Sequence, residues 1–116
     1  MTAIDAQSAV RYEGGSAGTE IWGMTQADFL VVIPGHHAKE AAVNLTNAAA
    51  AWLARELGTA DSTEFRRETA RRIGTAFLSK VVANGLAVES ITIVSEGFLE
   101  VRPELVAELR VPEPAA

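Results

Sequence analysis

Two adjacent histidines, His36 and His37, are the side chains of this 116-residue chain best suited to do chemistry. They follow an apolar run, Phe29–Ile33, and the turn-forming pair Pro34-Gly35. If a helix begins here, its first amides lack a side-chain acceptor and would attract an anion. Two imidazoles beside those amides could bind the anion or exchange protons near neutral pH.

A helix starting at His37 would place His37, Glu40 and Asn44 on one stripe, where they could hold a metal with ligands from elsewhere. The candidate ligand-binding residues are therefore Gly35, His36, His37, Glu40 and Asn44. The competing interpretation is a loop with two solvated histidines, because the chain has no His-Glu-x-x-His sequence and no glycine-rich phosphate loop. We assign no metal ligands and predict no cofactor.

Four arginines lie close together in a segment expected to be helical: Arg66, Arg67, Arg71 and Arg72. Four cations on one helix could bind phosphates. However, Glu64 and Glu68 stand three or four residues from several of them, which is the spacing of ion pairs on a helix surface. A solvated or partner-facing helix surface is the favoured interpretation.

The remaining polar and aromatic residues give weaker signals. Tyr12 and Trp22 could line a small-molecule pocket, but core packing explains them equally well. The carboxylates of the last third of the chain show no pairing that would make a catalytic acid and base: Glu89, Glu96, Glu100, Glu104 and Glu108. Whether the chain is an enzyme is therefore left open.

Composition places the chain among ordinary soluble domains. It is 48% hydrophobic and 22% charged, which is enough to build one core without metal or disulfide support. The absence of cysteine fits a cytoplasmic protein. A net charge of −5 argues against nucleic-acid binding. We expect no membrane association, because no signal peptide is evident and no apolar run approaches about 20 residues.

The elements that would position the histidines are predicted as strands followed by helices. Short strands are expected at Val10–Glu13 and Glu20–Met24, and Phe29–Ile33 reads as a strand buried on both faces. A helix is predicted over His37–Leu57, with Trp52 as its large anchor and Gly58 after its end.

A second helix is predicted over Thr63–Asn84, capped by Asp61 or Ser62. Its buried side would contain Ala70, Ile73, Phe77 and Val81, with Phe77 fully enclosed. Gly74 on that side would suit a close helix crossing. Because the link between the two helices is short, we expect an antiparallel helical hairpin.

The remainder reads as strands at Val88–Ser95, Phe98–Val101 and Leu105–Val111. The last of these alternates apolar and polar residues, and a helical turn starting at Pro103 is the competing interpretation. The predicted fold is α+β: a mostly antiparallel sheet with an antiparallel two-helix hairpin on one face, in the order β-β-β-α-α-β-β-β. Residues 1–116 form a single domain, with a loose N-terminal arm at 1–9 and a C-terminal tail at 112–116.

The last predicted strand carries the functional expectation. Bordered by Pro103 and Pro112, it would be an edge strand whose unpaired amides and carbonyls a second chain could satisfy. Leu105, Ala107 and Leu109 are the predicted interface residues of a two-fold homo-oligomer, with a charge-protected monomer as the alternative. The leading hypothesis is a non-enzymatic interaction or assembly subunit that self-associates and could bind a protein partner. The alternative is a small ligand-binding protein or enzyme with an anion or metal site around His36 and His37.

Overall fold

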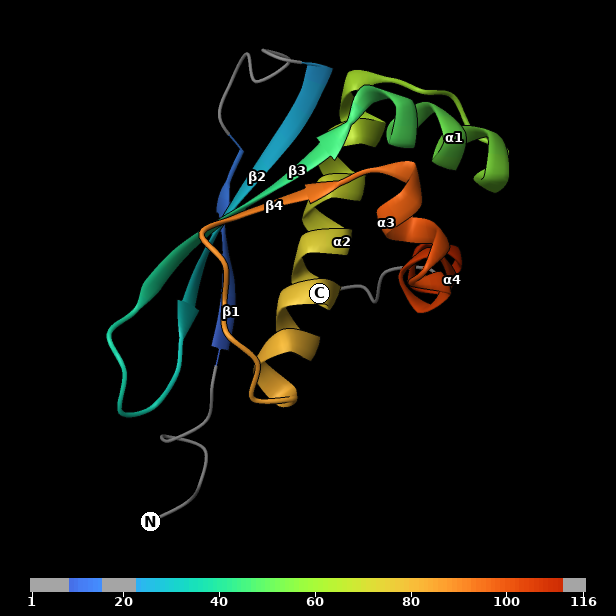
Figure 1. Cartoon of the computed structure of the whole chain (residues 1–116). Helices are drawn as coiled ribbons and strands as arrows, with labels where there is room; N and C mark the ends of the chain where they lie inside the picture. Colours follow the sequence, from blue (N-terminus) through green and yellow to red (C-terminus); the bar gives the residue numbers. More distant parts are fainter. Residues whose placement is uncertain (1–8, 16–22, 112–116) are drawn as a thin grey trace.

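One mixed sheet forms the centre of the structure, a computed structural model that describes residues 9–15 and 23–111. Its strands are β1 (Ala9–Gly14), β2 (Met24–Val32), β3 (Lys39–Thr46) and β4 (Ile91–Val94), which lie side by side in that order. The first three pair antiparallel, and β4 runs parallel to β3. Helices α1 (Asn47–Leu57), α2 (Thr63–Ala83), α3 (Glu96–Glu100) and α4 (Pro103–Arg110) lie on one face of this sheet (Figure 1). The chain is therefore α+β with a mainly antiparallel sheet, as predicted.

Strand β2 is longer than the sequence indicated. It begins at Met24 and includes Thr25–Asp28, the residues between the two predicted strands Glu20–Met24 and Phe29–Ile33. Every second residue, such as Phe29 and Val31, is buried against the helices. The residues between them, such as Leu30, lie on the other face and are only half-buried. The prediction of a strand buried on both faces is therefore wrong. Most of the predicted strand Glu20–Met24 falls outside the described residues, as do the N-terminal arm before Ala9 and the tail 112–116.

Strand β3 occupies the first half of the predicted helix His37–Leu57. Residues 39–46 pair along their whole length with β2 and turn Ala41, Val43 and Leu45 toward the helices. The helix begins only at Asn47, where the Thr46 hydroxyl accepts a hydrogen bond from the Ala49 amide at 3.1 Å. It ends at Gly58, which has a φ of 68° and closes the helix as predicted.

Helix α2 confirms its predicted bounds and its cap. The Ser62 hydroxyl accepts from the Phe65 amide at 3.0 Å, and Asn84 follows the last helical residue. Gly74 does allow a close approach, but to the sheet, because a Cβ there would overlap the Phe29 ring. Phe77 is half-buried and not fully enclosed as predicted; its ring centroid lies 5.1 Å from that of Phe98.

The predicted helical hairpin differs from what is observed. Helix α1 crosses near one end of α2 instead of running alongside it, and the layer also contains α3 and α4 (Figure 1). The predicted strand Val88–Ser95 contains β4, but the strands predicted at Phe98–Val101 and Leu105–Val111 are wrong, because these segments belong largely to α3 and α4. Across the described residues, no helix is both long and apolar enough to cross a membrane.

Candidate functional site

The histidine pair lies in the turn between β2 and β3. The His36 amide donates to the Ile33 carbonyl at 3.0 Å, which closes a four-residue turn with Pro34 and Gly35 at its centre. Gly35 has a φ of 82°, as the third residue of a type II turn requires. Since β3 follows this turn, no helix begins here, and the prediction of uncapped helical amides around Gly35 is wrong.

A groove of about 540 Å³ separates this turn from the end of α2. Its apolar walls come from both elements and include Val31, Ile33, Val82 and Val88. Three polar side chains line it: His36, His37 and Lys39. Lys39 lies directly opposite Val31 across the β2–β3 pair. The structure thus puts both histidines at a concave surface and adds Lys39, which the sequence did not single out.

The other predicted ligand residues do not join this groove. Strand alternation puts Glu40 and Asn44 on the face of the sheet away from the helices, opposite in direction to Lys39. Glu40 instead lines a depression of about 540 Å³ on that face, together with Glu13 and Asp28. Within 9–15 and 23–111, no group of three or more His, Asp or Glu side chains is arranged to hold a metal ion.

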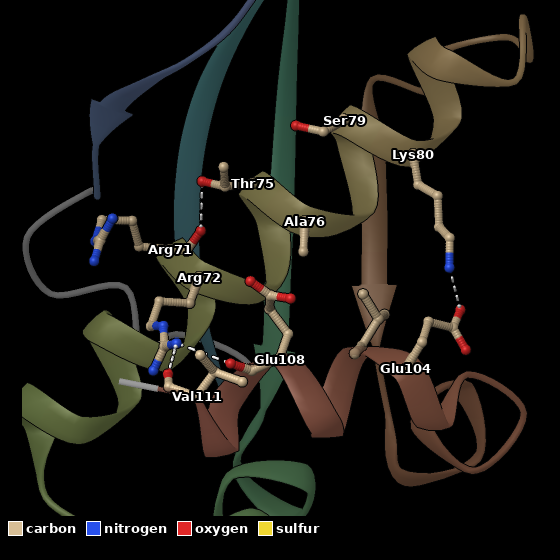
Figure 2. A pocket seen from close by; sticks show the side chains of 10 residues that line it. Arg71, Arg72, Thr75, Ala76, Ser79, Lys80, Glu104, Glu108 and Val111 are labelled. Atoms are coloured by element: carbon tan, nitrogen blue, oxygen red, sulfur yellow. Dashed lines mark hydrogen bonds and ion pairs between the residues drawn. The ribbon is translucent and has the colours of Figure 1, made fainter. Parts of the chain in front are cut away.

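The predicted interface residues lie on a helix. In α4, Leu105 is buried, Leu109 is half-buried and Ala107 is exposed, so the three do not share one strand face. Arg72 of α2 donates to the carbonyl oxygens of Glu108 at 2.8 Å and Val111 at 2.6 Å (Figure 2). These bonds satisfy carbonyls at the C-terminus of α4, where a cation is also favoured by the helix dipole.

The groove between α2 and α4 is bordered by paired charges. It has a volume of about 650 Å³, and at its other end Lys80 meets Glu104 at 3.2 Å (Figure 2). The backbone amide of Glu104 and then Lys80 hold the pKa of this carboxyl below its usual 4.5. These contacts hold α4 against α2, so we interpret the groove as part of the packing between the two helices.

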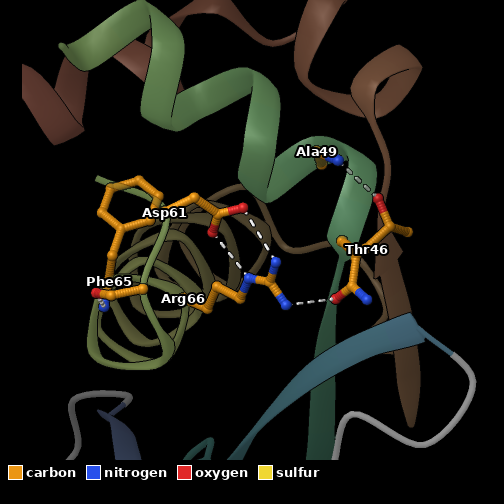
Figure 3. Close-up of polar contacts among 7 residues, drawn as sticks. Thr46, Ala49, Asp61, Phe65 and Arg66 are labelled. Atoms are coloured by element: carbon orange, nitrogen blue, oxygen red, sulfur yellow. Dashed lines mark hydrogen bonds and ion pairs between the residues drawn. The ribbon is translucent and has the colours of Figure 1, made fainter. Parts of the chain in front are cut away.

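Two other arginines of the cluster, Arg66 and Arg71, also form ion pairs within the chain. Arg66 forms a two-pronged pair with Asp61, at 2.8 and 3.0 Å, and also donates to the Asn47 side chain at 3.2 Å (Figure 3). Arg71 pairs with Glu68 on the same helix, as the spacing predicted. Tyr12 packs its ring against Phe29, with centroids 5.6 Å apart, and Trp22 lies outside the described residues.

The Asp61–Arg66 pair should make stability depend on pH. The hydrogen bond from Arg66 holds the pKa of Asp61 below its usual 3.8, and partial burial opposes this shift. We expect Asp61→Asn to cost about 0.5–1 kcal/mol at neutral pH, since water reaches the pair. The contribution is complete above the unfolded-state pKa and is lost as the pH falls through the lower folded-state pKa.

Urea unfolding of both proteins between about pH 7 and pH 3 measures this difference. The difference in unfolding free energy between wild type and Asp61→Asn should disappear toward the acidic end of this range. Glu100→Gln, at an exposed position of α3, serves as the control and should show no such pattern. A gap that stays constant over the whole range would contradict the assignment.

The position of strand β4 at one edge of the sheet is the feature that the sequence missed. β4 pairs with β3 on one side, and no described strand pairs with its other side. Its Ile91 and Ile93 are 66% and 52% exposed on the face away from the helices. The signal was present in the alternating Ile-Thr-Ile-Val sequence, but its place at the edge depends on the strand order.

Comparison with known proteins gives no match: no family model fits the chain, and neither the curated proteins nor the solved structures include one similar to it.

Proposed function

We propose that the chain is a non-enzymatic interaction or assembly subunit that self-associates through β4. The observation that carries the proposal is the pair of exposed isoleucines, Ile91 and Ile93, on a strand whose outer edge has no partner in the described part of the chain. Exposed apolar groups that cluster are typical of interaction surfaces. A free strand edge adds unpaired amides and carbonyls that a second strand can satisfy.

The strand carries few of the devices that block unwanted pairing. Proteins protect edges with lysine, proline, bulges or very short strands. β4 (Ile91–Val94) is short, but it contains no charge, no proline and no bulge. The acidic residues Glu89 and Glu96 stand just outside it. Because like charges directly opposite one another are destabilising, they would select among the possible registers.

One register satisfies these constraints best. A two-fold axis perpendicular to the sheet makes two β4 strands antiparallel. Because directly opposite residues share a face of the sheet, the axis must lie midway between one residue and its own copy. An axis at Thr92 places Ile91 opposite Ile93 of the second copy, twice, and Glu89 opposite Ser95. Two apolar cross-strand pairs form and no like charges meet. The dimer would have one continuous sheet, with the same surface used by both copies.

Static light scattering over a range of concentrations tests self-association. We expect wild type to reach twice the mass of one chain. Ile91→Lys/Ile93→Lys should weaken dimerisation at least about a hundredfold, because it places ammonium groups in the paired surface. Since both side chains are more than half exposed, the variant should fold normally.

Val101→Lys is the matched control. Val101 is 73% exposed, and it follows α3 and is not part of β4. The variant replaces an exposed apolar side chain with lysine, as each of the two isoleucine substitutions does, and it should leave the dimer intact. A wild type that stays monomeric at every accessible concentration contradicts the proposal, as does a dimer that the double lysine variant leaves unchanged.

A further inference from the structure

The groove beside the histidines has rigid walls on both sides. One wall is the turn closed by Gly35. The other is the end of α2, where the Leu86 amide donates to the Val81 carbonyl at 3.0 Å and the Gly85 amide donates to Val82 at 3.1 Å. This pair of bonds, with Gly85 at a φ of 67°, is the Schellman arrangement that fixes the chain after a helix. Backbone hydrogen bonds therefore fix both walls of the groove.

The groove combines an apolar surface with positive charge. Val31 and Val88 form buried parts of its walls, and Leu86 stands at the rim, 60% exposed. Lys39 and the two histidines supply the hydrogen-bond donors, and no described carboxylate lines the groove. This lining is unusual in a chain of net charge −5. Carbonyls at the end of α2 would disfavour an anion, but those of Val81 and Val82 already accept hydrogen bonds.

We propose that this groove binds a small amphipathic carboxylate. The apolar body of the ligand would lie on Val31, Val82 and Leu86, and its carboxylate would meet Lys39 and the imidazoles. A volume of about 540 Å³ falls within the range of small-molecule pockets. The charge pattern selects a monoanion over a neutral or cationic amphiphile. This site is independent of self-association, since β4 does not line it.

Titration with octanoate, followed by backbone amide NMR, tests the proposal. Saturable shifts should be confined to residues 31–39 and 82–88. Octanol lacks the charge and acetate lacks the apolar body, so each should bind at least about tenfold more weakly than octanoate. Octylamine, which reverses the charge, should bind no better than octanol.

Variants distinguish a built site from general attraction to the surface. Lys39→Gln and Leu86→Ser should each weaken octanoate binding severalfold, and both positions are exposed enough to leave the fold intact. Arg67→Gln removes an exposed cation from α2 outside the groove and should change nothing. The proposal is overturned if octanoate produces no saturable shifts, if octanol binds equally well, or if the Arg67 variant loses as much affinity as the Lys39 variant.

Discussion

Replacing Gly74 with valine is expected to cost about 3 kcal/mol or more of unfolding free energy, because the residue sits where α2 meets the sheet. A Cβ at this position would overlap the Phe29 ring and would lie 3.3 Å from the Val43 side chain. Both neighbours are buried in the core and have little room to move. The two further methyl groups of valine would require α2 to shift away from β2. Urea unfolding of wild type and variant measures the loss.

Alanine at the same position separates packing from helix propensity. In a helix interior alanine is favoured over glycine by about 1 kcal/mol, but at Gly74 the overlap should outweigh that gain and destabilise the protein. Gly97 in α3 is the matched control, because a Cβ there would meet only the Ser95 hydroxyl oxygen at 3.9 Å. Gly97→Ala should be neutral or stabilising. If both alanine variants are stabilised, the close packing of α2 on Phe29 is contradicted.

Leu105→Ala should cost about 2–5 kcal/mol, the usual range for a fully buried leucine. Leu105 is 2% exposed and is the side chain that α4 inserts into the core beside α2. Its loss would leave a cavity beneath a helix that is otherwise held by exposed or half-buried contacts from Arg72 and Lys80. Thermal or urea unfolding detects the change.

Ala107→Gln distinguishes a helix from the strand predicted for this segment. On a strand, positions 105 and 107 share a face and would be equally sensitive. On α4, Ala107 is exposed, so the glutamine should change stability by no more than about 0.5 kcal/mol. Large losses of similar size at Ala107 and Leu105 would support the strand interpretation and contradict the helix.

Sequence patterns predicted elements best where local signals agreed. Helix α2 combines a Ser62 cap, a long amphipathic pattern and an Asn84-Gly85 end. The cap and the end are confirmed, but of the predicted buried side only Ala70 and Ile73 are buried, whereas Phe77 and Val81 are half-buried. The pattern of β4 also gave the correct element. The helix predicted over His37–Leu57 is correct only in its second half, from Asn47. Alanine is compatible both with a helix and with the small-residue positions of a buried strand. Thr46, three residues before Ala49, was a usable cap signal for the true start of α1.

The wrong secondary-structure predictions arose where the apolar residues fit both a helix and a strand, and contacts with distant residues determine which one forms. Leu105 and Leu109 are four residues apart. This spacing fits two repeats of a strand, whose period is two residues, and also about one turn of a helix. Pro103 and the carbonyl caps from Arg72 decide for a helix, and the second of these lies 37 residues away in sequence. The pairing of β3 with β2 is likewise not visible in the local sequence pattern. This pairing outweighs the helix propensity of Ala41 and Ala42.

Only part of the lining of the groove beside the histidines could be predicted from sequence. His36 and His37 line a groove, but as part of a strand connection, and the predicted helical stripe with Glu40 and Asn44 does not exist. Lys39, Val82 and Leu86 could not be added from sequence, because they meet the histidines only when the end of α2 packs beside the β2–β3 turn. The edge strand predicted at Leu105–Val111 is likewise absent, because this segment belongs largely to α4, and the edge of the sheet is formed by β4.

Disulfide formation across β4 tests the proposed assembly most directly. The chain contains no cysteine, so the Ile91→Cys and Ile93→Cys proteins each carry one thiol and can be mixed in a redox buffer. Directly opposite residues on antiparallel strands have Cβ atoms about 4.5–5.5 Å apart, close to the span of a disulfide. The account predicts that the mixed 91–93 disulfide dominates over both symmetric ones, whereas Val101→Cys stays reduced. A random mixture of the three disulfides, or crosslinking no better than that of Val101→Cys, would contradict it.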